Sequence, residues 1–531
     1  MADWEPFWTD EVTIENGGKY PLLLNRFHDH LEEHLIKGIV SVTDRLRYIS
    51  YCCWAIGDIE HTLHCEKYYE FEEAFRRREG ALAIGTYLLQ PVTAIGNYTI
   101  YGRDVMRGKV EDVYEEYDTS FRILPSNPLG AYGQYYKGTI QNWGLTYIDD
   151  NGIIRLTDSG DELYTIMEKV YQKNKYYSSY KGNRSVPGKI LMSWAEINQY
   201  DNMRDNRHQE ERDFYKNILF HLDQEKTNDF RRDTLTIYLE CIIEAEKNNR
   251  TFNDQLISNT VYYQKYVNDD NKVYKFTVSP FLEEASFYWL IYELHVYFRW
   301  WISEYLRYFL RLIATRGEGF TIDEIIKMVN KSVFNQTIAE YLGVYDNYHD
   351  MIFSILMSKI TSFKSSNERL LEDEISYNEA SNFSQVSASL LMIISLLYQK
   401  YSEIEDDYRF HYIRIHLSED YWFKDIYDIM NILKEKTISE VLYLLLFRFV
   451  IQKHDLALYE KHDLRRCWFT RAGDRYQHQA DSTSIWRPAK HTNICNFLFD
   501  MGLIEVKEKT FVITEEGNIL YKELRENYYE E

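Results

Sequence analysis

The stretch MGLIEVKEKTFVITEEGNILYKEL occupies residues 501–524 and has a partial copy, WGLTYIDDNGIIRLTDSGDELY, at residues 143–164. Each copy has a Gly-Leu pair, two β-rich runs around a polar turn, and a Thr-x-x-Gly sequence. Glycine commonly ends a helix in the left-handed conformation, and threonine is a good N-terminal cap. The sequence therefore predicts a helix, a hairpin and a second helix in both places.

This order of elements resembles the winged-helix fold of many bacterial transcription regulators. The turn of the earlier copy contains Asp-Asn-Gly, which suits a hairpin, and acidic residues follow each threonine, where they suit the positive end of a helix. In that family the helix before the Gly-Leu pair enters the DNA major groove, and the hairpin, or wing, touches phosphates. The resemblance implies a DNA-contacting function for at least one copy.

In the later copy the recognition helix would span residues 488–500. The resemblance implies that its polar side chains are exposed and that its wing carries lysines: Lys490, His491, Asn493, Asn496, Lys507 and Lys509. The wing of the earlier copy instead carries Asp149 and Asp150, which are poor phosphate contacts. We interpret that copy as a protein-docking winged helix. The alternative is that both copies serve only packing or oligomerisation.

The rest of the chain is predicted to be helical. It has 531 residues, 45% of them hydrophobic, with only 8 prolines and 23 glycines. The low proline and glycine content leaves few turns and favours long helices. The length is enough for three or four domains. The fold class is mainly α, a multi-domain helical scaffold with two small winged-helix (α+β) modules. The expected divisions are a helical domain at 1–122, the first module with a basic linker at 123–195, a central helical domain at 196–460, and the C-terminal module at 461–531.

Basic residues gather beside each copy, although the formal net charge is −22. Residues 169–195 contain six basic residues and no acidic one, with tyrosines between them, and residues 465–490 contain six more. Basic residues with stacking aromatics suit contact with a nucleic-acid backbone. The predicted DNA-binding residues are Lys173, Lys175, Lys181, Arg184, Arg471, Arg475, Arg487, Lys490, His491, Asn493, Lys507 and Lys509. The alternative is that the lysine-rich segments only improve solubility.

The cysteines and the apolar segments indicate a cytoplasmic protein. The six cysteines show no CxxC pair, and Cys52 and Cys53 lie in an apolar run typical of core thiols in a reducing compartment. The N-terminal sequence MADWEPFWTDEV lacks the basic and apolar regions of a signal peptide. The most apolar stretch, residues 285–315, is interrupted by charges and predicts a buried helix rather than a membrane span.

One short motif favours an enzyme instead. His30, Glu33 and His34 follow the H-x-x-E-H order of inverted zinc peptidases, in which two histidines on one helix face share a zinc ion and the glutamate acts as a base. A distal glutamate ligand and the expected α/β domain are not recognisable. A second Cys/His set has spacing unlike a zinc knuckle: Cys467, His478, His491 and Cys495. We therefore assign no catalytic residue and no cofactor, and keep a zinc-dependent hydrolase as the alternative.

The segment GIVSVTDRLRYISYCCWAIGDIEHT at residues 38–62, with the helix AFRRREGALAIGTYLL after it, resembles an uncharacterised group of bacterial proteins. Their genes occur beside helicase, nuclease or ATPase genes in phage-defence islands. The matching residues are Thr43, Arg45, Arg47, Tyr48 and Trp54. The resemblance implies a role in phage defence, but it does not imply a mechanism. The alternative is that the arginines anchor a helix while the aromatic residues pack beneath it.

Taken together, these patterns favour a non-enzymatic, DNA-sensing or adaptor subunit of an anti-phage defence complex. The expected partners are DNA and other protein subunits, including an ATPase, helicase or nuclease, and self-association is also open. A protein–protein scaffold without DNA binding is the main alternative.

Overall fold

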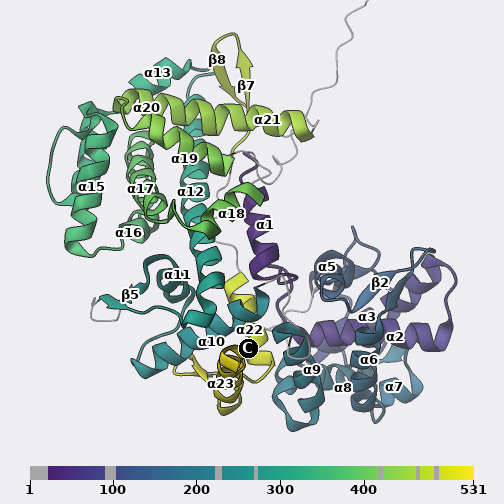
Figure 1. The fold of residues 1–531 in the computed structure, drawn as a ribbon. Coiled ribbons are helices and arrows are strands. Elements are labelled where there is room, and N and C mark those ends of the chain that lie inside the picture. The colour runs from purple at the N-terminus through teal and green to yellow at the C-terminus, as the bar shows by residue number, and fades with distance from the viewer. Residues whose placement is uncertain are drawn as a thin grey trace, which may run out of the picture.

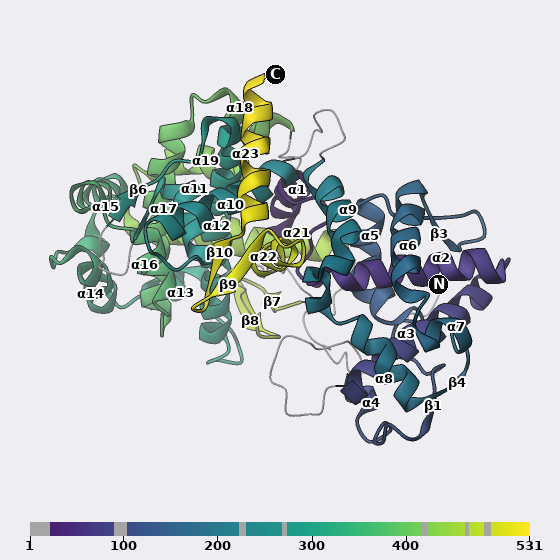
Figure 2. The ribbon, with the colours of Figure 1, turned by 90° about the horizontal axis from the view of Figure 1, so that it is seen from below.

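A computed structural model describes residues 22–89, 103–221, 230–267, 273–416, 422–461, 467–482 and 490–530. The chain is mainly helical, and each described sheet consists of two antiparallel strands. Figures 1 and 2 show two helical lobes with α1 (Asn25–Leu35) and α22 (Lys490–Asp500) between them. Within the described residues, no helix is long and apolar enough to cross a membrane.

The N-terminal lobe, residues 43–221, is built on α2 (Leu46–Leu63). Residues 46–59 of this helix are buried on all sides, as expected for a helix in the middle of a core. α3 (Tyr68–Leu89) packs along α8 (Gly188–Ile197), which lies beyond the expected division at residue 122. The smaller elements are α4 (Arg103–Met106), β1 (Glu116–Asp118), α7 (Lys175–Ser179), β4 (Ser185–Pro187), η2 (Tyr200–Arg204), η3 (Asn206–His208) and α9 (Gln209–Phe220).

The C-terminal lobe, residues 230–482, surrounds the long helices α12 (Glu283–Ile313) and α17 (Phe383–Ile404), which pack against each other. α12 is the helix predicted from the apolar stretch, and most of it is buried. The surrounding elements are α10 (Arg231–Lys247), α11 (Asp254–Tyr263), β5 (Lys265–Val267), β6 (Val273–Lys275), η4 (Pro280–Leu282), α13 (Ile322–Lys327), α14 (Lys331–Leu342), η5 (Tyr348–Asp350), α15 (Phe353–Asn367), α16 (Leu371–Tyr377), α18 (Tyr408–His416), α19 (Trp422–Leu433), α20 (Ile438–Leu445), η6 (Leu446–Ile451), α21 (Gln452–Lys461), β7 (Phe469–Ala472) and β8 (Arg475–His478).

The two lobes share one hydrophobic core, because buried apolar side chains form a continuous cluster from the first described residues to Leu520. α1 packs on α12, and α22 (Lys490–Asp500) contacts α2 of one lobe and α10 of the other. Helix α22 therefore lies where the two lobes meet, as Figure 1 shows.

Candidate functional site: paired helix–hairpin–helix units and a lysine-lined pocket

Both related segments fold into a helix, an antiparallel hairpin and a second helix. We call them unit 1 and unit 2. Unit 1 consists of η1 (Tyr132–Tyr136), α5 (Lys137–Asn142), β2 (Thr146–Ile148), β3 (Ile154–Leu156) and α6 (Asp158–Tyr171). Unit 2 consists of α22, β9 (Ile504–Lys507), β10 (Thr510–Ile513) and α23 (Glu515–Glu530).

The two units have the same hydrogen-bond framework. In unit 1, Gly144 has a φ of +69°, the Thr157 hydroxyl donates to its carbonyl at 2.5 Å, and the Gly160 N–H donates to the Thr157 hydroxyl oxygen at 3.2 Å. In unit 2 the φ is +78°, and the corresponding distances are 2.8 and 3.0 Å, at Gly502, Thr514 and Gly517. The repeated glycines and threonines thus have the local roles that the sequence predicts.

A supporting helix holds each hairpin in an equivalent way. The backbone N–H of Leu156 donates to Oε2 of Glu60 on α2 at 3.2 Å. The N–H of Ile513, at the equivalent position, donates to Oε2 of Glu246 on α10 at 3.3 Å. Sequence reasoning missed both glutamates because they lie 96 and 267 residues from their partners.

The helix of unit 2 is buried between the lobes. The expected exposure of His491 and Asn493 is wrong, because these side chains are only 8% and 3% exposed. Asn493 donates to the carbonyl of Val40 at 2.7 Å, and His491 hydrogen-bonds the hydroxyl of Tyr238. This face of α22 therefore serves contacts within the molecule.

Lys490, at the start of α22, is also engaged. Its ammonium forms an ion pair with Glu32 of α1. Burial lowers the pKa of Lys490 to about 8, against the opposing effect of Asp29. An ammonium held in this way is poorly placed to contact a phosphate in solution.

The C-terminal end of α22 is fixed by Asp500, which is fully buried. Arg45 donates to its carboxylate from Nε at 3.1 Å and from Nη2 at 2.6 Å, and the backbone N–H of Leu46 donates at 3.0 Å. Leu46 is the first residue of α2, so the carboxylate lies at the positive end of that helix. Arg45, singled out in the sequence, thus joins unit 2 to the N-terminal lobe.

The first helix of unit 1 is held at its start by the buried Glu79 of α3. The Glu79 carboxylate accepts the backbone N–H groups of Ala131 and Tyr132 at 2.9 and 3.1 Å and the hydroxyl of Tyr48 at 2.5 Å. Burial raises the pKa of Glu79 to about 7, although these three hydrogen bonds oppose the shift.

Unit 1 also has side chains that are exposed to solvent, on its first helix and on its hairpin. Gln134, Gly138 and Asn142 are exposed along its first helix. On β2, Tyr147 is 49% exposed and Ile148 is 48% exposed. We call these five exposed residues together the open face. They include two amide side chains, a glycine and two largely apolar side chains, and Tyr147 and Ile148, as successive strand residues, project to opposite sides of the hairpin.

The acidic wing of unit 1 is partly used by its own turn. Asp149 accepts the N–H groups of Asn151 and Ile153, each at 2.9 Å, and the guanidinium Nε of Arg155 at 3.0 Å. The backbone hydrogen bonds and Arg155 hold the pKa of Asp149 below its usual value. Asp150 remains exposed beside the open face.

Several of the predicted DNA-binding residues pair with carboxylates. The pairs are Lys181 with Asp58 at 2.6 Å, Arg184 with Asp118 at 3.0 Å, Arg475 with Glu324 at 3.1 Å and Lys507 with Glu505 at 2.7 Å. Lys173, Lys175, Arg471 and Lys509 are exposed and have no acidic partner among the described residues. Arg487 lies outside the described residues.

The structure does not assemble either candidate zinc set. His30 and Glu33 are exposed on α1, and His34 is half-buried with its ring 6.2 Å from that of Tyr288. No group of three or more His, Cys, Asp or Glu side chains in the described ranges is arranged to hold a metal ion. The other set is dispersed: Cys467 donates to Phe469, His478 contacts Asp481, His491 contacts Tyr238, and Cys495 is a separate buried thiol.

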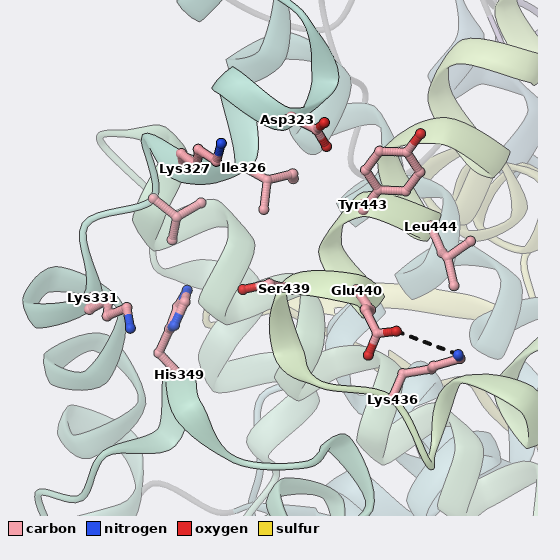
Figure 3. A pocket seen from close by; sticks show the side chains of 11 residues that line it. Asp323, Ile326, Lys327, Lys331, His349, Lys436, Ser439, Glu440, Tyr443 and Leu444 are labelled. Carbon is pink, nitrogen blue, oxygen red and sulfur yellow. Dashed lines mark hydrogen bonds and ion pairs between the residues drawn. The ribbon is translucent and has the colours of Figure 1, made fainter.

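A pocket of about 640 Å³ lies in the C-terminal lobe between α13, the start of α14, η5 and α20. Figure 3 shows its lining side chains arranged around the space on these separate elements. The lining contains three lysines, two acids, a histidine, two hydroxyls and an apolar wall: Lys327, Lys331, Lys436, Asp323, Glu440, His349, Ser439, Tyr443, Ile326, Val329 and Leu444. Sequence reasoning missed this site, because no motif links residues 323–349 with residues 436–444.

The pocket is built on firm helix starts. Thr321 and Glu324 form a capping box at the start of α13, and Thr437 and Glu440 form another at the start of α20. Each box satisfies N-terminal backbone groups that a helix otherwise leaves unpaired. The backbone of these first turns is therefore well fixed, and so are the positions from which their side chains project.

Comparison with known proteins found no matching family model, no similar curated protein and no similar solved structure.

Proposed function

We propose that this protein is a non-enzymatic adaptor subunit of a bacterial anti-phage defence complex, and that it docks a partner protein on the open face of unit 1. The defence setting rests on the resemblance of residues 38–62. The docking proposal rests on one structural observation: the two units share a framework and both expose part of their hairpin, but only unit 1 also leaves a face of its first helix exposed. We also propose that both units are winged helices, with α2 and α10 as their supporting helices.

The chemistry of the open face favours a protein partner. Tyr147 and Ile148 lie on β2, which pairs only with β3 among the described strands. An unpaired strand edge with exposed apolar side chains can accept an extended peptide segment. The exposed Asp150 next to it favours a segment that carries apolar residues followed by lysine or arginine.

DNA sensing is the second candidate. It is supported by the exposed, unpaired Lys173 and Lys175 and by the exposed Arg471 and Lys509. It is weakened by the burial of α22 and by the ion pairs of five other basic residues, Lys181, Arg184, Arg475, Lys490 and Lys507. DNA contact would therefore be limited to the phosphate backbone, without major-groove reading by α22.

A co-purification experiment with paired variants tests the adaptor proposal. Ile148→Asp alters the open face, and Val506→Asp makes the same change at the equivalent, 55% exposed position of unit 2. We expect the natural complex, purified through a tag on this chain, to lose a stoichiometric subunit in I148D and to keep it in V506D. Retention of every subunit by a folded I148D protein would contradict docking on the open face.

A gel-shift titration tests the second candidate. If the purified chain binds duplex DNA at low salt, the affinity falls steeply with salt, and Lys173→Glu with Lys175→Glu removes the binding, DNA sensing replaces pure adaptor function. We expect no such binding, because the molecule has a net charge of −22.

A further inference from the structure

The charged side chains that line the pocket in the C-terminal lobe differ in whether they already have a hydrogen-bond or ion-pair partner. Lys331 pairs with Asp350 at 2.7 Å, and Glu440 accepts the backbone N–H of Thr437 at 2.9 Å. Lys436 lies 3.5 Å from Glu440, which Figure 3 marks with a dashed line. Lys327 has no hydrogen bond or ion pair within the described part of the chain, so one ammonium group at the pocket is available for a ligand.

His349 adds a polar group at the wall of the pocket. It is 6% exposed, and its Nε2 is buried without a partner in the described structure. Its Nδ1 faces the Asp350 carboxylate at 3.5 Å, which favours the proton on Nδ1 and leaves Nε2 as an acceptor. The backbone N–H of His349 donates to Asn335 at 2.8 Å, which fixes the position of the residue.

The remaining surface of the pocket is suited to a flat, weakly polar body. Ile326, Val329 and Leu444 form an apolar wall, and the ring of Tyr443 stands at the edge of the space in Figure 3. The hydroxyl of Ser439 lies across from His349 in the same view. A pocket of about 640 Å³ is in the ordinary range for small-molecule sites.

We propose that this pocket binds a mononucleotide. The phosphate lies against the free ammonium group of Lys327, because lysine binds phosphate as a compact point charge. The base packs on the apolar wall beside Tyr443. Asp323 accepts a hydrogen bond from a hydroxyl or amino group of the nucleotide. The adaptor would thereby carry a nucleotide site in the lobe opposite its docking face.

Calorimetric titration of the full chain with AMP, GMP, CMP and UMP tests the proposal, with inorganic phosphate and the free nucleosides as separate probes. We expect at least one mononucleotide to bind more tightly than either of its halves. Lys327→Ala is expected to weaken that binding roughly tenfold, through loss of one charged hydrogen bond. Ser439→Trp, which fills the pocket, is expected to abolish it.

Lys359→Ala is the matched control, because Lys359 is an exposed lysine of the same lobe that pairs with Asp346 at 2.6 Å and does not line the pocket. Its affinity should equal that of the natural chain. The proposal is overturned if no mononucleotide binds at millimolar concentration, if a nucleoside binds as tightly as its nucleotide, or if a folded K327A or S439W protein binds as tightly as the natural chain.

Discussion

Unit 1 and unit 2 have the same local structure but opposite surroundings. In both, a left-handed glycine, a capping threonine and a glutamate of a supporting helix hold the hairpin in place. In unit 1 the first helix has an exposed face, whereas in unit 2 the corresponding helix is buried between the lobes. The comparison teaches that the repeated sequence specifies the hydrogen-bond framework of a unit. Residues far away in the sequence decide whether its first helix is buried or remains exposed to bind a partner.

One pair of equivalent positions shows this difference clearly. Two residues before the glycine, unit 1 has Asn142 and unit 2 has Asp500. Asn142 is exposed, whereas Asp500 is buried against Arg45 and the first turn of α2. The units also touch directly, because the rings of Trp143 and Phe497 meet edge to face with centroids 5.7 Å apart. Unit 2 is therefore an internal connector, and its charge pair with Arg45 is part of the connection.

The largest predicted effect breaks that connection. Asp500→Ala leaves Arg45 buried without its main counter-charge, and breaking a buried ion pair typically costs about 3–5 kcal/mol. Asn142→Ala, at the equivalent exposed position, should change the free energy of unfolding by less than about 0.5 kcal/mol. Urea unfolding of the two variants and the natural chain measures both values. Equal effects of the two substitutions would show that the units are not differently buried.

The second prediction concerns the carboxyl that holds unit 1. The folded pKa of Glu79 is about 7, above its ordinary value of 4.5. Below about pH 4.5 the carboxyl is protonated in both the folded and the unfolded chain, so its contribution to stability is fully present. As the pH rises through 7, that contribution is lost, by roughly 3 kcal/mol for a shift of this size.

Glu79→Gln removes this titration and keeps most of the hydrogen-bonding capacity. We expect the free energy of unfolding of the natural chain to fall relative to E79Q between pH 5 and pH 8, measured by urea unfolding at each pH. A constant difference between the two proteins over this range would mean that Glu79 does not titrate there.

The framework of each unit could be predicted from the sequence because it depends on neighbours. Gly144, Thr157 and their counterparts act within about thirteen residues of one another, and cap and turn preferences are local properties. The buried helix at residues 285–315 was predictable for a similar reason, since its composition alone excludes a membrane span. In both cases the deciding information lies in one short stretch.

The site residues were harder to predict because their surroundings come from far along the chain. The burial of Asn493 depends on the carbonyl of Val40, 453 residues away, and that of Asp500 depends on Arg45. The pocket likewise joins His349 with Ser439, which share no motif. A single sequence shows that such residues are polar, but not which of them meet.

The third prediction has a smaller effect and tests whether the frameworks are truly alike. A Cβ on Gly160 would clash with the carbonyl of Leu145, and a Cβ on Gly517 would clash with the carbonyl of Leu503. Each carbonyl belongs to the residue after the helix-ending glycine, so the second helix approaches the first strand equally closely in both units. Gly160→Ala and Gly517→Ala should therefore each cost about 1–3 kcal/mol, in nearly equal amounts, by urea unfolding.

Gly138→Ala is the control, because Gly138 is an exposed residue of α5 whose added Cβ would meet nothing within 4 Å. This substitution should stabilise the protein by about 0.5–1 kcal/mol, since alanine favours a helix over glycine. If the carbonyl contact is the cause, the costs at Gly160 and Gly517 remain equal even though one unit is open and the other is buried. A clearly larger loss of unfolding free energy for Gly517→Ala would instead mean that the tolerance of a Cβ at this position depends on packing against the lobes. The framework of each unit would then not be independent of its surroundings.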